Sequence, residues 1–430
     1  MKQIISQLID DFHERKLPDL MPRDIPLYEI HGKASVIIGM RRSGKTWFLF
    51  QKIKSLCDKG INKNRMLYLN FEDDRLIDFH VSKFQDILDV YYARFPNNKN
   101  HRCYFFLDEI QRIQHWESFI RRLIDTENVQ IFISGSSSKL LSSEIATCLR
   151  GRSLPIVMYP FSFSEFLRYH NYFSTVPRSF GSKNAAILRN AMNQYFIMGG
   201  FPEVQLLEKQ LQTEILQGYL DSVLLKDIIE RHHVTNITAL KYLLRQIMHS
   251  CSEKFSINKF YHTMKSMSVK CSKDNLYTYM EYLTDAFVCY KIPIHTLSEK
   301  TRIVNPVKVY VVDNGLVNAM TFRHTVNNGA LLENLVFMHL LRKGYEIAYI
   351  NTQSGYETDF FAKHSVTGDM HLFQVCWDMS NEKTFNRELR GMKAAMQELS
   401  LDNASIITWD DEQVLEHNIS VVPIWKWLIL

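Results

Sequence analysis

Short apolar runs alternate with amphipathic stretches along the N-terminal part of the chain. Five runs are rich in β-branched and aromatic residues and have the length of buried strands: 34–38, 66–69, 104–107, 129–133 and 154–157. The segments between them carry apolar residues at helical spacing, as in 47–56. Strands that alternate with helices form a parallel sheet covered by helices. The pattern therefore predicts an α/β domain.

The first run leads directly into a phosphate-binding motif. Residues 39–46 read Gly-Met-Arg-Arg-Ser-Gly-Lys-Thr and fit G-x-x-x-x-G-K-[ST] between a strand and a helix. Its glycines let the backbone amides face a phosphate, Lys45 neutralises the outer phosphates, and the Thr46 hydroxyl is placed to hold Mg²⁺. The expected ligands are therefore ATP and Mg²⁺. We expect nucleotide contacts from Gly39, Arg41, Arg42, Ser43, Gly44, Lys45, Thr46 and Trp47.

Two acids, Asp108 and Glu109, follow the apolar run 104–107. A buried strand that ends in two acids can deliver one carboxylate to Mg²⁺ and a second to the attacking water. We expect Asp108 to act at the metal and Glu109 to orient or deprotonate the water. A solvated acidic turn is the alternative, but a position one strand beyond a phosphate loop favours the catalytic reading.

Polar residues flank the last two runs of this part of the chain. Ser134 and Ser136 follow the run 129–133 and are candidate sensors of the γ-phosphate, although serines there would also cap the next helix. Arg152 precedes the run 154–157 and is the candidate arginine finger, which would act within its own chain or across a subunit boundary. Surface charge is the alternative for this arginine.

The composition is that of a globular protein. The chain has 430 residues, 46% of them hydrophobic and 12% aromatic, which predicts roughly two or three domains of about 150 residues. Seven cysteines form no C-x-x-C pair, so neither a disulfide framework nor a zinc site is indicated. The apolar runs are far shorter than the roughly 20 residues of a membrane span, and the N-terminus fits an amphipathic helix. We expect a cytoplasmic protein without a membrane partner.

The middle of the chain has helical periodicity. Apolar residues at core spacing occupy 187–196 and 215–224, and the turn 199–202 separates them, as in a two-helix lid. Residues 240–312 then predict three helices and a hairpin, which is the order of a winged helix. We expect a helix-turn-helix whose recognition helix exposes Asn275, Tyr277, Thr278 and Tyr279.

Basic residues accompany this predicted helix-turn-helix. Four lysines lie on it and three basic residues lie on the predicted wing: Lys259, Lys265, Lys270 and Lys273, then Lys300, Arg302 and Lys308. Such a surface can neutralise phosphates, so double-stranded DNA is one expected partner. A winged helix that serves only as a packing module is the alternative. The net charge of +5 permits nucleic-acid binding without arguing for it.

Polar residues interrupt three apolar segments in the last third of the chain. Glu333 lies on an apolar helix, Asp359 on a following strand, and Gln374-Val375-Cys376 on the strand after that. This outline resembles the restriction-endonuclease-like fold, in which the last three positions read E-x-K. In an active site of this fold the acids hold Mg²⁺ and a lysine stabilises charge near the attacking water. The lysine is absent here, and Lys383 is the candidate substitute. We therefore expect Glu333, Asp359 and Gln374 to form a degenerate nuclease site.

Motifs in a fixed order connect these features. The segments G-M-R-R-S-G-K-T, L-N-F-E-D-D-R, F-F-L-D-E-I-Q, F-I-S-G-S-S-S-K-L-L, L-R-G-R and Y-P-F-S-F-S-E-F resemble the AAA+-type ATPases of prokaryotes that carry a second, C-terminal domain. The resemblance covers nearly the whole chain. It implies an additional-strand P-loop ATPase that works as a homo-oligomer, with DNA as a partner.

Together these features predict an α/β fold with four parts: a P-loop ATPase domain (1–165) whose parallel sheet has helices on both faces, a helical lid or linker (166–238), a winged helix (239–322) and a restriction-endonuclease-like α/β domain (323–430). The expected function is Mg²⁺-dependent hydrolysis of ATP to ADP and phosphate, coupled to DNA or to a protein partner. A nucleotide-gated DNA nuclease and a slow-turnover scaffold or signalling switch are the alternatives.

Overall fold

The computed structural model describes residues 1–430 except 136–148, 176, 178, 322–326, 380–381 and 416–417. The chain divides into two compact units, Met1–Tyr159 and Pro160–Leu430. Ser136 lies outside the described residues, and so does the Lys383 side chain. The finer domain boundaries within the second unit stay predictions.

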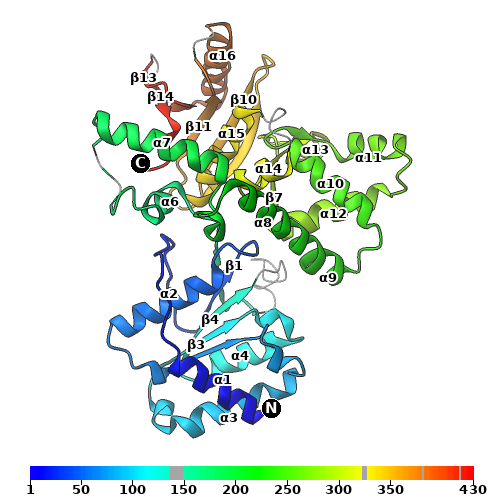
Figure 1. Ribbon diagram of the computed structural model, residues 1–430. Coiled ribbons are helices and arrows are strands. Elements are labelled where there is room, and N and C mark those ends of the chain that lie inside the picture. The colour runs from blue at the N-terminus through cyan, green and yellow to red at the C-terminus, as the bar shows by residue number, and fades with distance from the viewer. Residues whose placement is uncertain (136–148, 176, 178, 322–326, 380–381, 416–417) are drawn as a thin grey trace. The chain divides into compact units, whose positions relative to one another are not determined.

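The first unit is a five-stranded parallel sheet with helices on both faces (Figure 1). Its strand order is β2-β3-β4-β1-β5, so β4 is inserted between β1 and β3, as the resemblance to additional-strand ATPases implied. The strands are β1 (Ala34–Ile38), β2 (Met66–Asn70), β3 (Cys103–Asp108), β4 (Val129–Gly135) and β5 (Ser153–Val157). Each lies within two residues of its predicted run, which confirms the α/β prediction.

Helices of the first unit cover the sheet because apolar residues alternate on its strands. Phe106 and Phe132 face one side, where they form a core with Phe12 and Phe48 from two helices, and Phe105 faces the other side against Tyr91. The helices are α1 (Lys2–Glu14), α2 (Lys45–Asp58), α3 (Phe84–Arg94) and α4 (Trp116–Thr126). The expected amphipathic N-terminal helix is thus α1.

The second unit begins with helices and a small antiparallel sheet. Its elements are α6 (Phe163–Tyr169), α7 (Ser182–Met198), α8 (Lys209–Ser222), which continues as a π-helix (Val223–Ile229), α9 (Glu230–His232), α10 (Ile237–His249), β6 (Lys254–Phe255), α11 (Ile257–Ser266), α12 (Lys273–Asp285), β7 (Cys289–Ile292), α13 (Glu299–Val304), β8 (Val307–Val311) and α14 (Asn314–Met320). The part from α10 to β8 has the helices α10, α11 and α12, the short helix α13, and a sheet of order β6-β8-β7. The predicted order of three helices and a hairpin is therefore present, with α13 between the two hairpin strands, and the winged helix stays a prediction.

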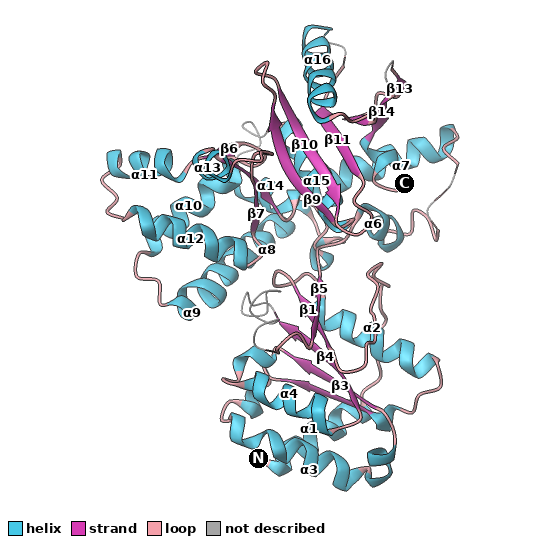
Figure 2. Cartoon of the chain, turned by 180° about the vertical axis from the view of Figure 1, so that it is seen from behind, coloured by secondary structure: helices cyan, strands magenta, loops and turns pink. Residues whose placement is uncertain are grey.

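A six-stranded mixed sheet completes the second unit (Figure 2). Its order is β13-β14-β12-β11-β10-β9, in which β9, β10 and β11 form an antiparallel meander and β11, β12 and β14 are parallel. The elements are α15 (Asn328–Arg342), β9 (Tyr345–Asn351), β10 (Glu357–His364), β11 (Met370–Cys376), α16 (Glu382–Leu399), β12 (Ala404–Thr408), β13 (Gln413–Val414), β14 (Ile419–Pro423) and α17 (Ile424–Trp427).

Alternating residues of β10 pack this mixed sheet between two helices. Phe360 packs against Phe337 of α15, whereas Phe361 joins the core formed with α16. Helices α15 and α16 therefore cover opposite faces of this sheet.

The turn after α7 is fixed by a buried acid. Asp313 accepts a hydrogen bond from the amide of Gly200 at 2.7 Å and another from the amide of Gly315 at 2.9 Å. A Cβ atom at Gly200 would lie 2.3 Å from the carbonyl oxygen of Phe161, so this position requires glycine. Burial raises the pKa of Asp313 to about 6. The turn 199–202 thus joins two helices, as predicted, by docking on α14.

Helix α7 packs on the mixed sheet of its own unit. The ring of Phe196 lies 5.5 Å from that of Trp377 and 5.0 Å from that of Trp409, and Arg189 pairs with Asp410 at 2.5 Å. The lid helix predicted from the sequence therefore has its partners in the C-terminal part of the chain.

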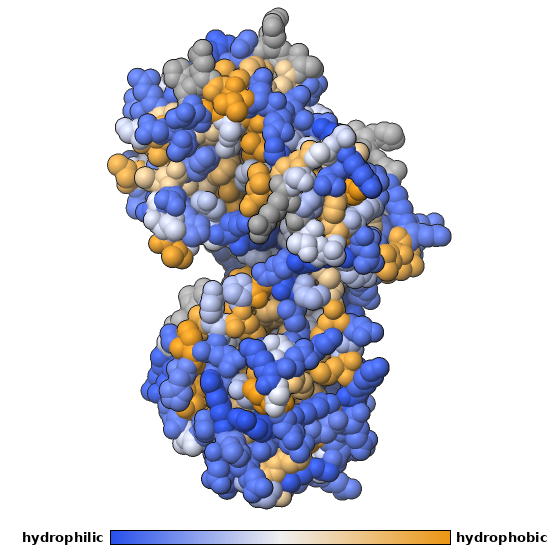
Figure 3. Space-filling view, turned by 90° about the vertical axis from the view of Figure 1, so that its left-hand side faces the viewer, coloured by the Kyte–Doolittle hydropathy of each residue, from blue (hydrophilic) through white to orange (hydrophobic). Residues whose placement is uncertain are grey.

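The surface drawn in Figure 3 is mostly hydrophilic, with smaller hydrophobic areas between the polar residues. Among the described residues, no helix combines the length and apolar character required to cross a membrane.

Candidate nucleotide site and a second polar cluster

The phosphate-binding motif forms the loop between β1 and α2. Gly39 has a φ of 147°, Arg42 a φ of 67° and Gly44 a φ of 101°, so the loop uses backbone conformations that glycine adopts most easily. A Cβ atom at Gly39 would lie 2.2 Å from the carbonyl oxygen of Met158. The first glycine of the motif is therefore required by the close approach of the chain that follows β5.

Lys45 lies across this loop. Its side chain is buried, and its ammonium donates hydrogen bonds to the carbonyl oxygens of Gly39 and Met40, both at 3.0 Å. The Ser43 hydroxyl is also buried and has no hydrogen-bond partner among the described residues. Trp47 is 54% exposed on the first turn of α2, and Arg41 lies 3.5 Å from Glu72 after β2. The loop thus presents a cation and an unsatisfied hydroxyl at one place.

Asp108 ends β3 and accepts hydrogen bonds from three neighbouring elements. Thr46 of α2 donates at 2.8 Å, Tyr68 of β2 donates at 3.0 Å, and the Ser134 hydroxyl of β4 donates to the other carboxylate oxygen. Burial raises the pKa of Asp108 and the charge of Glu109 acts in the same direction, while the three hydroxyl donors oppose the shift. The residue predicted to serve the metal is therefore in contact with the motif threonine.

Glu109 lies beside Asp108 in a left-handed turn. Its φ is 53°, its amide donates to the carbonyl of Ser134 at 2.9 Å, and its carboxylate accepts from the Gln111 amide group. The side chain is nearly buried. Both predicted acids thus lie at the carboxyl edge of the sheet, together with Ser134 and the phosphate loop.

Arg152 lies at the opposite edge of the same sheet. It immediately precedes β5, whose first residue Ser153 is in register with Ala34, the first residue of β1. The five-residue β1 spans about 16 Å and separates this edge from the loop. Arg152 also pairs with Asp125 at 2.6 Å. It is therefore not placed to contact the nucleotide of its own chain, which corrects one form of the arginine-finger hypothesis and leaves action across a subunit boundary as a prediction.

Two residues near the loop were not identified from the sequence. Tyr68 lies at an inward-facing position of β2, so the hydrophobic pattern of the sequence predicts only a core residue there. Arg23 lies in an irregular segment before β1, is 8% exposed, and donates to the carbonyls of Ser43 at 2.9 Å and Tyr159 at 2.6 Å. No periodic pattern marks Arg23, because its role depends on contacts between distant parts of the chain.

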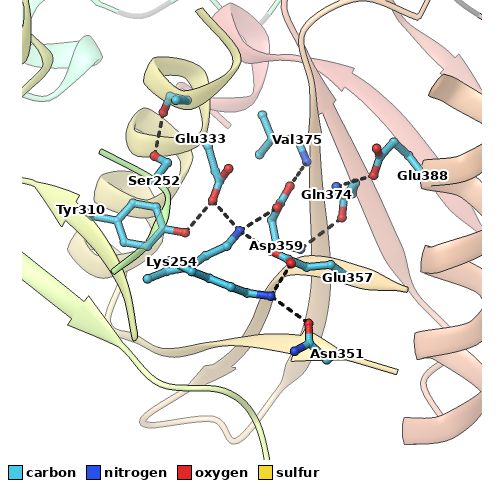
Figure 4. A network of polar contacts seen from close by, with 12 residues as sticks. Ser252, Lys254, Tyr310, Glu333, Asn351, Glu357, Asp359, Gln374, Val375 and Glu388 are labelled. Atoms are coloured by element: carbon cyan, nitrogen blue, oxygen red, sulfur yellow. Dashed lines mark hydrogen bonds and ion pairs between the residues drawn. The ribbon is translucent and has the colours of Figure 1, made fainter. Parts of the chain in front are cut away.

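The residues predicted as a degenerate nuclease site are brought together in the second unit (Figure 4). Glu333 of α15 and Asp359 of β10 both contact the ammonium of Lys308 at 3.0 Å. Gln374 of β11 accepts from the amide of Asp359 at 3.1 Å and donates to Glu388 of α16 at 2.7 Å. Lys308, which the sequence placed on an exposed wing, is 4% exposed. This corrects its predicted role as a DNA-facing residue.

The residues at the phosphate loop fit ATP and Mg²⁺. Lys45 supplies the positive charge, the amides between the two glycines supply donors, and Thr46 and Asp108 supply oxygen ligands 2.8 Å apart, which suits a hard cation. Glu109 lies next to Asp108 at this edge, and Glu72 follows the neighbouring strand β2.

Comparisons with known proteins identify relatives of this chain. Residues 31–167 match the model of a family described as AAA domain, and residues 189–327 match a domain of unknown function (DUF8612). The chain is 36% identical to Uncharacterized protein MJ1544 of Methanocaldococcus jannaschii over 98% of this chain and 93% of that protein. It is also 32% identical to an uncharacterized protein of Haemophilus influenzae, over 76% of this chain and 79% of that protein.

Among solved structures, the Orc1 protein of Aeropyrum pernix, determined in complex with DNA, aligns with 74% of this chain and 90% of its own at 11% identity. The TM-score of this alignment is 0.30. The two relatives of more than 30% identity show the family of this chain. This chain belongs to the same family as these archaeal and bacterial proteins, a family of P-loop AAA+ ATPases that carry a second domain of unknown function.

Proposed function

We propose that this protein is an Mg²⁺-dependent ATPase that hydrolyses ATP to ADP and phosphate, and that its second unit couples hydrolysis to double-stranded DNA. One observation carries the ATPase proposal: the 2.8 Å contact between Thr46 and Asp108, with Lys45 and Glu109 at the same edge of the sheet. Phosphoryl transfer depends mainly on positioning and charge stabilisation, and this edge contains a residue for each task.

Each residue has a distinct part in the proposed reaction. Lys45 would exchange its two loop carbonyls for phosphate oxygens, and the loop amides would hold the phosphate chain. Thr46 and Asp108 would hold Mg²⁺, which when bound neutralises charge that develops on the phosphate oxygens. Glu109 would orient the attacking water and accept its proton. Ser134, which donates a hydrogen bond to Asp108, would position that carboxylate.

Steady-state hydrolysis and nucleotide binding test the ATPase proposal. Lys45→Ala should abolish both, whereas Glu109→Gln should bind ATP and lose turnover by at least about a hundredfold, the usual scale of a missing catalytic base. Lys54→Ala, which removes an exposed lysine from the same helix, is the matched control and should behave as wild type. Unchanged turnover in both Lys45→Ala and Glu109→Gln would refute the proposal.

The proposed DNA surface lies on α11, α12 and their connection. Lys259, Lys265, Lys270 and Lys273 are exposed there. On α12, Asn275, Tyr277 and Thr278 are exposed, and the Lys273 ammonium lies 5.9 Å from the centre of the Tyr277 ring. Tyr279 is buried, which corrects its predicted place on the exposed side. The remaining face combines positive charge with side chains that can donate hydrogen bonds to bases, as recognition helices do.

DNA coupling is tested by hydrolysis with and without duplex DNA over a salt series. DNA should stimulate wild type and the effect should fall with salt, because counterions are released when lysines neutralise phosphates. Lys270→Gln with Lys273→Gln should weaken the stimulation, and Lys363→Gln, an exposed lysine on β10, serves as the control. Hydrolysis indifferent to DNA would reject this coupling and favour a protein partner.

Two further assays separate the alternatives. A nucleotide-gated nuclease requires plasmid cleavage with Mg²⁺ or Mn²⁺, which we expect to be absent because the E-x-K lysine is missing. A slow switch would bind ATP and assemble without appreciable turnover. Light scattering of Glu109→Gln with ATP tests the proposed homo-oligomer, and Arg152→Ala should then reduce hydrolysis only if this arginine acts on a neighbouring subunit.

A further inference from the structure

Lys308 lies at the centre of three carboxylates. Its ammonium contacts Glu333 at 3.0 Å, Glu357 at 2.9 Å and Asp359 at 3.0 Å, and its side chain is 4% exposed. The acids come from α15 and β10, whereas the lysine comes from β8 of the three-stranded sheet. A single buried cation thus joins the small sheet to the helix and sheet that follow.

Strand pairing fixes the position of this lysine. Lys308 is in register with Lys254 on β6 and with Ile292 on β7, so its backbone lies in the central strand of the sheet. The ammonium of Lys254 contacts the second oxygen of Glu357 at 2.7 Å and Asn351 at 3.3 Å. Lys308 is therefore held from its backbone at one end and from three carboxylates at the other.

Two of the acids accept further hydrogen bonds. Tyr310 donates at 2.6 Å to the same oxygen of Glu333 that Lys308 contacts, and the amide of Val375 donates to the second oxygen of Asp359 at 3.0 Å. Burial alone would lower the pKa of Lys308, but the charges of Asp359, Glu333 and Glu357 outweigh it and raise the pKa. The lysine is therefore charged throughout the physiological pH range.

Three convergent carboxylates are the ligand type that Mg²⁺ and Mn²⁺ prefer. Here an ammonium binds one oxygen of each of them. With the ammonium in place, no group of three or more His, Cys, Asp or Glu side chains in the described parts of the chain could hold a metal ion. An ammonium can substitute for a divalent cation in neutralising the acids, but it cannot polarise a phosphate and a water together as a metal does.

We propose that Lys308 occupies the position that a divalent cation would take in this cluster, so that the wild-type site is closed to metal and serves as an ionic joint inside the second unit. Removal of the ammonium unmasks a site for Mg²⁺ or Mn²⁺ formed by Glu333, Glu357 and Asp359. This proposal is independent of the proposed ATPase, because the phosphate loop lies in the other unit.

Mn²⁺ titration followed by electron paramagnetic resonance tests the proposal on the full chain without nucleotide. Lys308→Met should bind about one more Mn²⁺ per chain than wild type, at least about tenfold more tightly than any binding at the wild-type cluster. Adding Asp359→Asn to Lys308→Met should remove that binding. Lys254→Met, which removes the neighbouring lysine and leaves Lys308 in place, is the matched control and should gain none.

Thermal unfolding gives a second measurement. Lys308→Met should unfold at a lower temperature than wild type, and Mn²⁺ should restore part of the loss. If Lys308→Met does not fold, Mn²⁺ binding is measured in the smaller change Lys308→Gln and in wild type. A folded Lys308 variant without added Mn²⁺ binding would overturn the proposal, and so would wild-type Mn²⁺ binding that Asp359→Asn abolishes.

Discussion

Arg23 offers a sharp test of how the phosphate loop is held. Its guanidinium donates to the carbonyl of Ser43 inside the loop at 2.9 Å and to the carbonyl of Tyr159 at 2.6 Å. The side chain is 8% exposed, so water cannot easily replace either bond. Arg23→Met would keep the apolar stem and remove both donors.

The expected cost follows from those two bonds. A hydrogen bond from a charged donor contributes about 1.5–3 kcal/mol, and a buried carbonyl left without a donor loses a similar amount. Loss of both should destabilise the first unit by about 3–6 kcal/mol. Because one of the two hydrogen bonds holds the Ser43 carbonyl inside the phosphate loop, the loop should be less ordered in the variant. ATP affinity should therefore fall by at least about tenfold, which corresponds to roughly 1.4 kcal/mol.

Hydrogen exchange and nucleotide binding measure the two effects. Peptides that cover residues 39–46 should exchange faster in Arg23→Met, and binding of a fluorescent ATP analogue should weaken. Arg23→Lys should fall between wild type and Arg23→Met, because one ammonium cannot reproduce the two-pronged guanidinium. Gln51→Ala removes side-chain contacts to the backbone of Arg23, at 2.8 and 3.3 Å, and leaves the guanidinium in place. Wild-type exchange and affinity in Arg23→Met would refute the reasoning.

Three further predictions concern other contacts. Gly200→Ala should destabilise the second unit by about 1–3 kcal/mol or more in urea unfolding, because the new Cβ would lie 2.3 Å from the carbonyl oxygen of Phe161; an unchanged midpoint would contradict this. Burial raises the pKa of Asp313 from 3.8 to about 6. The folded state therefore binds the proton of this carboxyl more tightly than the unfolded state does. The contribution of Asp313 to stability should fall as pH rises from about 4 to 6. Asp313→Asn should flatten that slope in thermal melts recorded across this range, and a wild-type slope would be the contrary result. Tyr68→Phe should lower the free energy of unfolding by about 1 kcal/mol, because it removes one hydrogen-bond donor from Asp108. It should also shift the acidic limb of the pH profile of hydrolysis to higher pH, because the Tyr68 hydroxyl opposes the raised pKa of that carboxylate. An unmoved limb would exclude this role.

Local patterns predicted most of the first unit. The strand runs, the glycine-containing loop and the pair Asp108-Glu109 are contiguous in sequence, so periodicity and motif spacing identify them without knowledge of the fold. The place of Arg152 in the sheet also follows from the sequence. A residue that precedes a parallel strand lies at the amino edge of the sheet, whereas the phosphate loop and Asp108 follow their strands at the carboxyl edge, so action within its own chain could have been excluded and action across a subunit boundary stays a prediction.

Contacts between distant residues escaped prediction for a physical reason. A lysine among exposed lysines carries no local sign that it will be buried, and Lys308 became the centre of a carboxylate cluster only through strand pairing and the docking of α15. Tyr279 likewise faces inward because α12 packs against α10, which fixes the helix rotation. The same holds for Asp313, whose acceptor role depends on a glycine turn more than 100 residues earlier, at Gly200.

The close approach of Met158 to the phosphate loop has a mechanical consequence. The chain leaves the first unit at Tyr159, directly after the Met158 amide donates to Ile38 at 2.6 Å and its carbonyl meets Gly39. Arg23 ties the next carbonyl to the loop as well. The last two residues of the first unit therefore pack directly on the phosphate loop, so a rearrangement of the loop that breaks these contacts also releases the end of this unit.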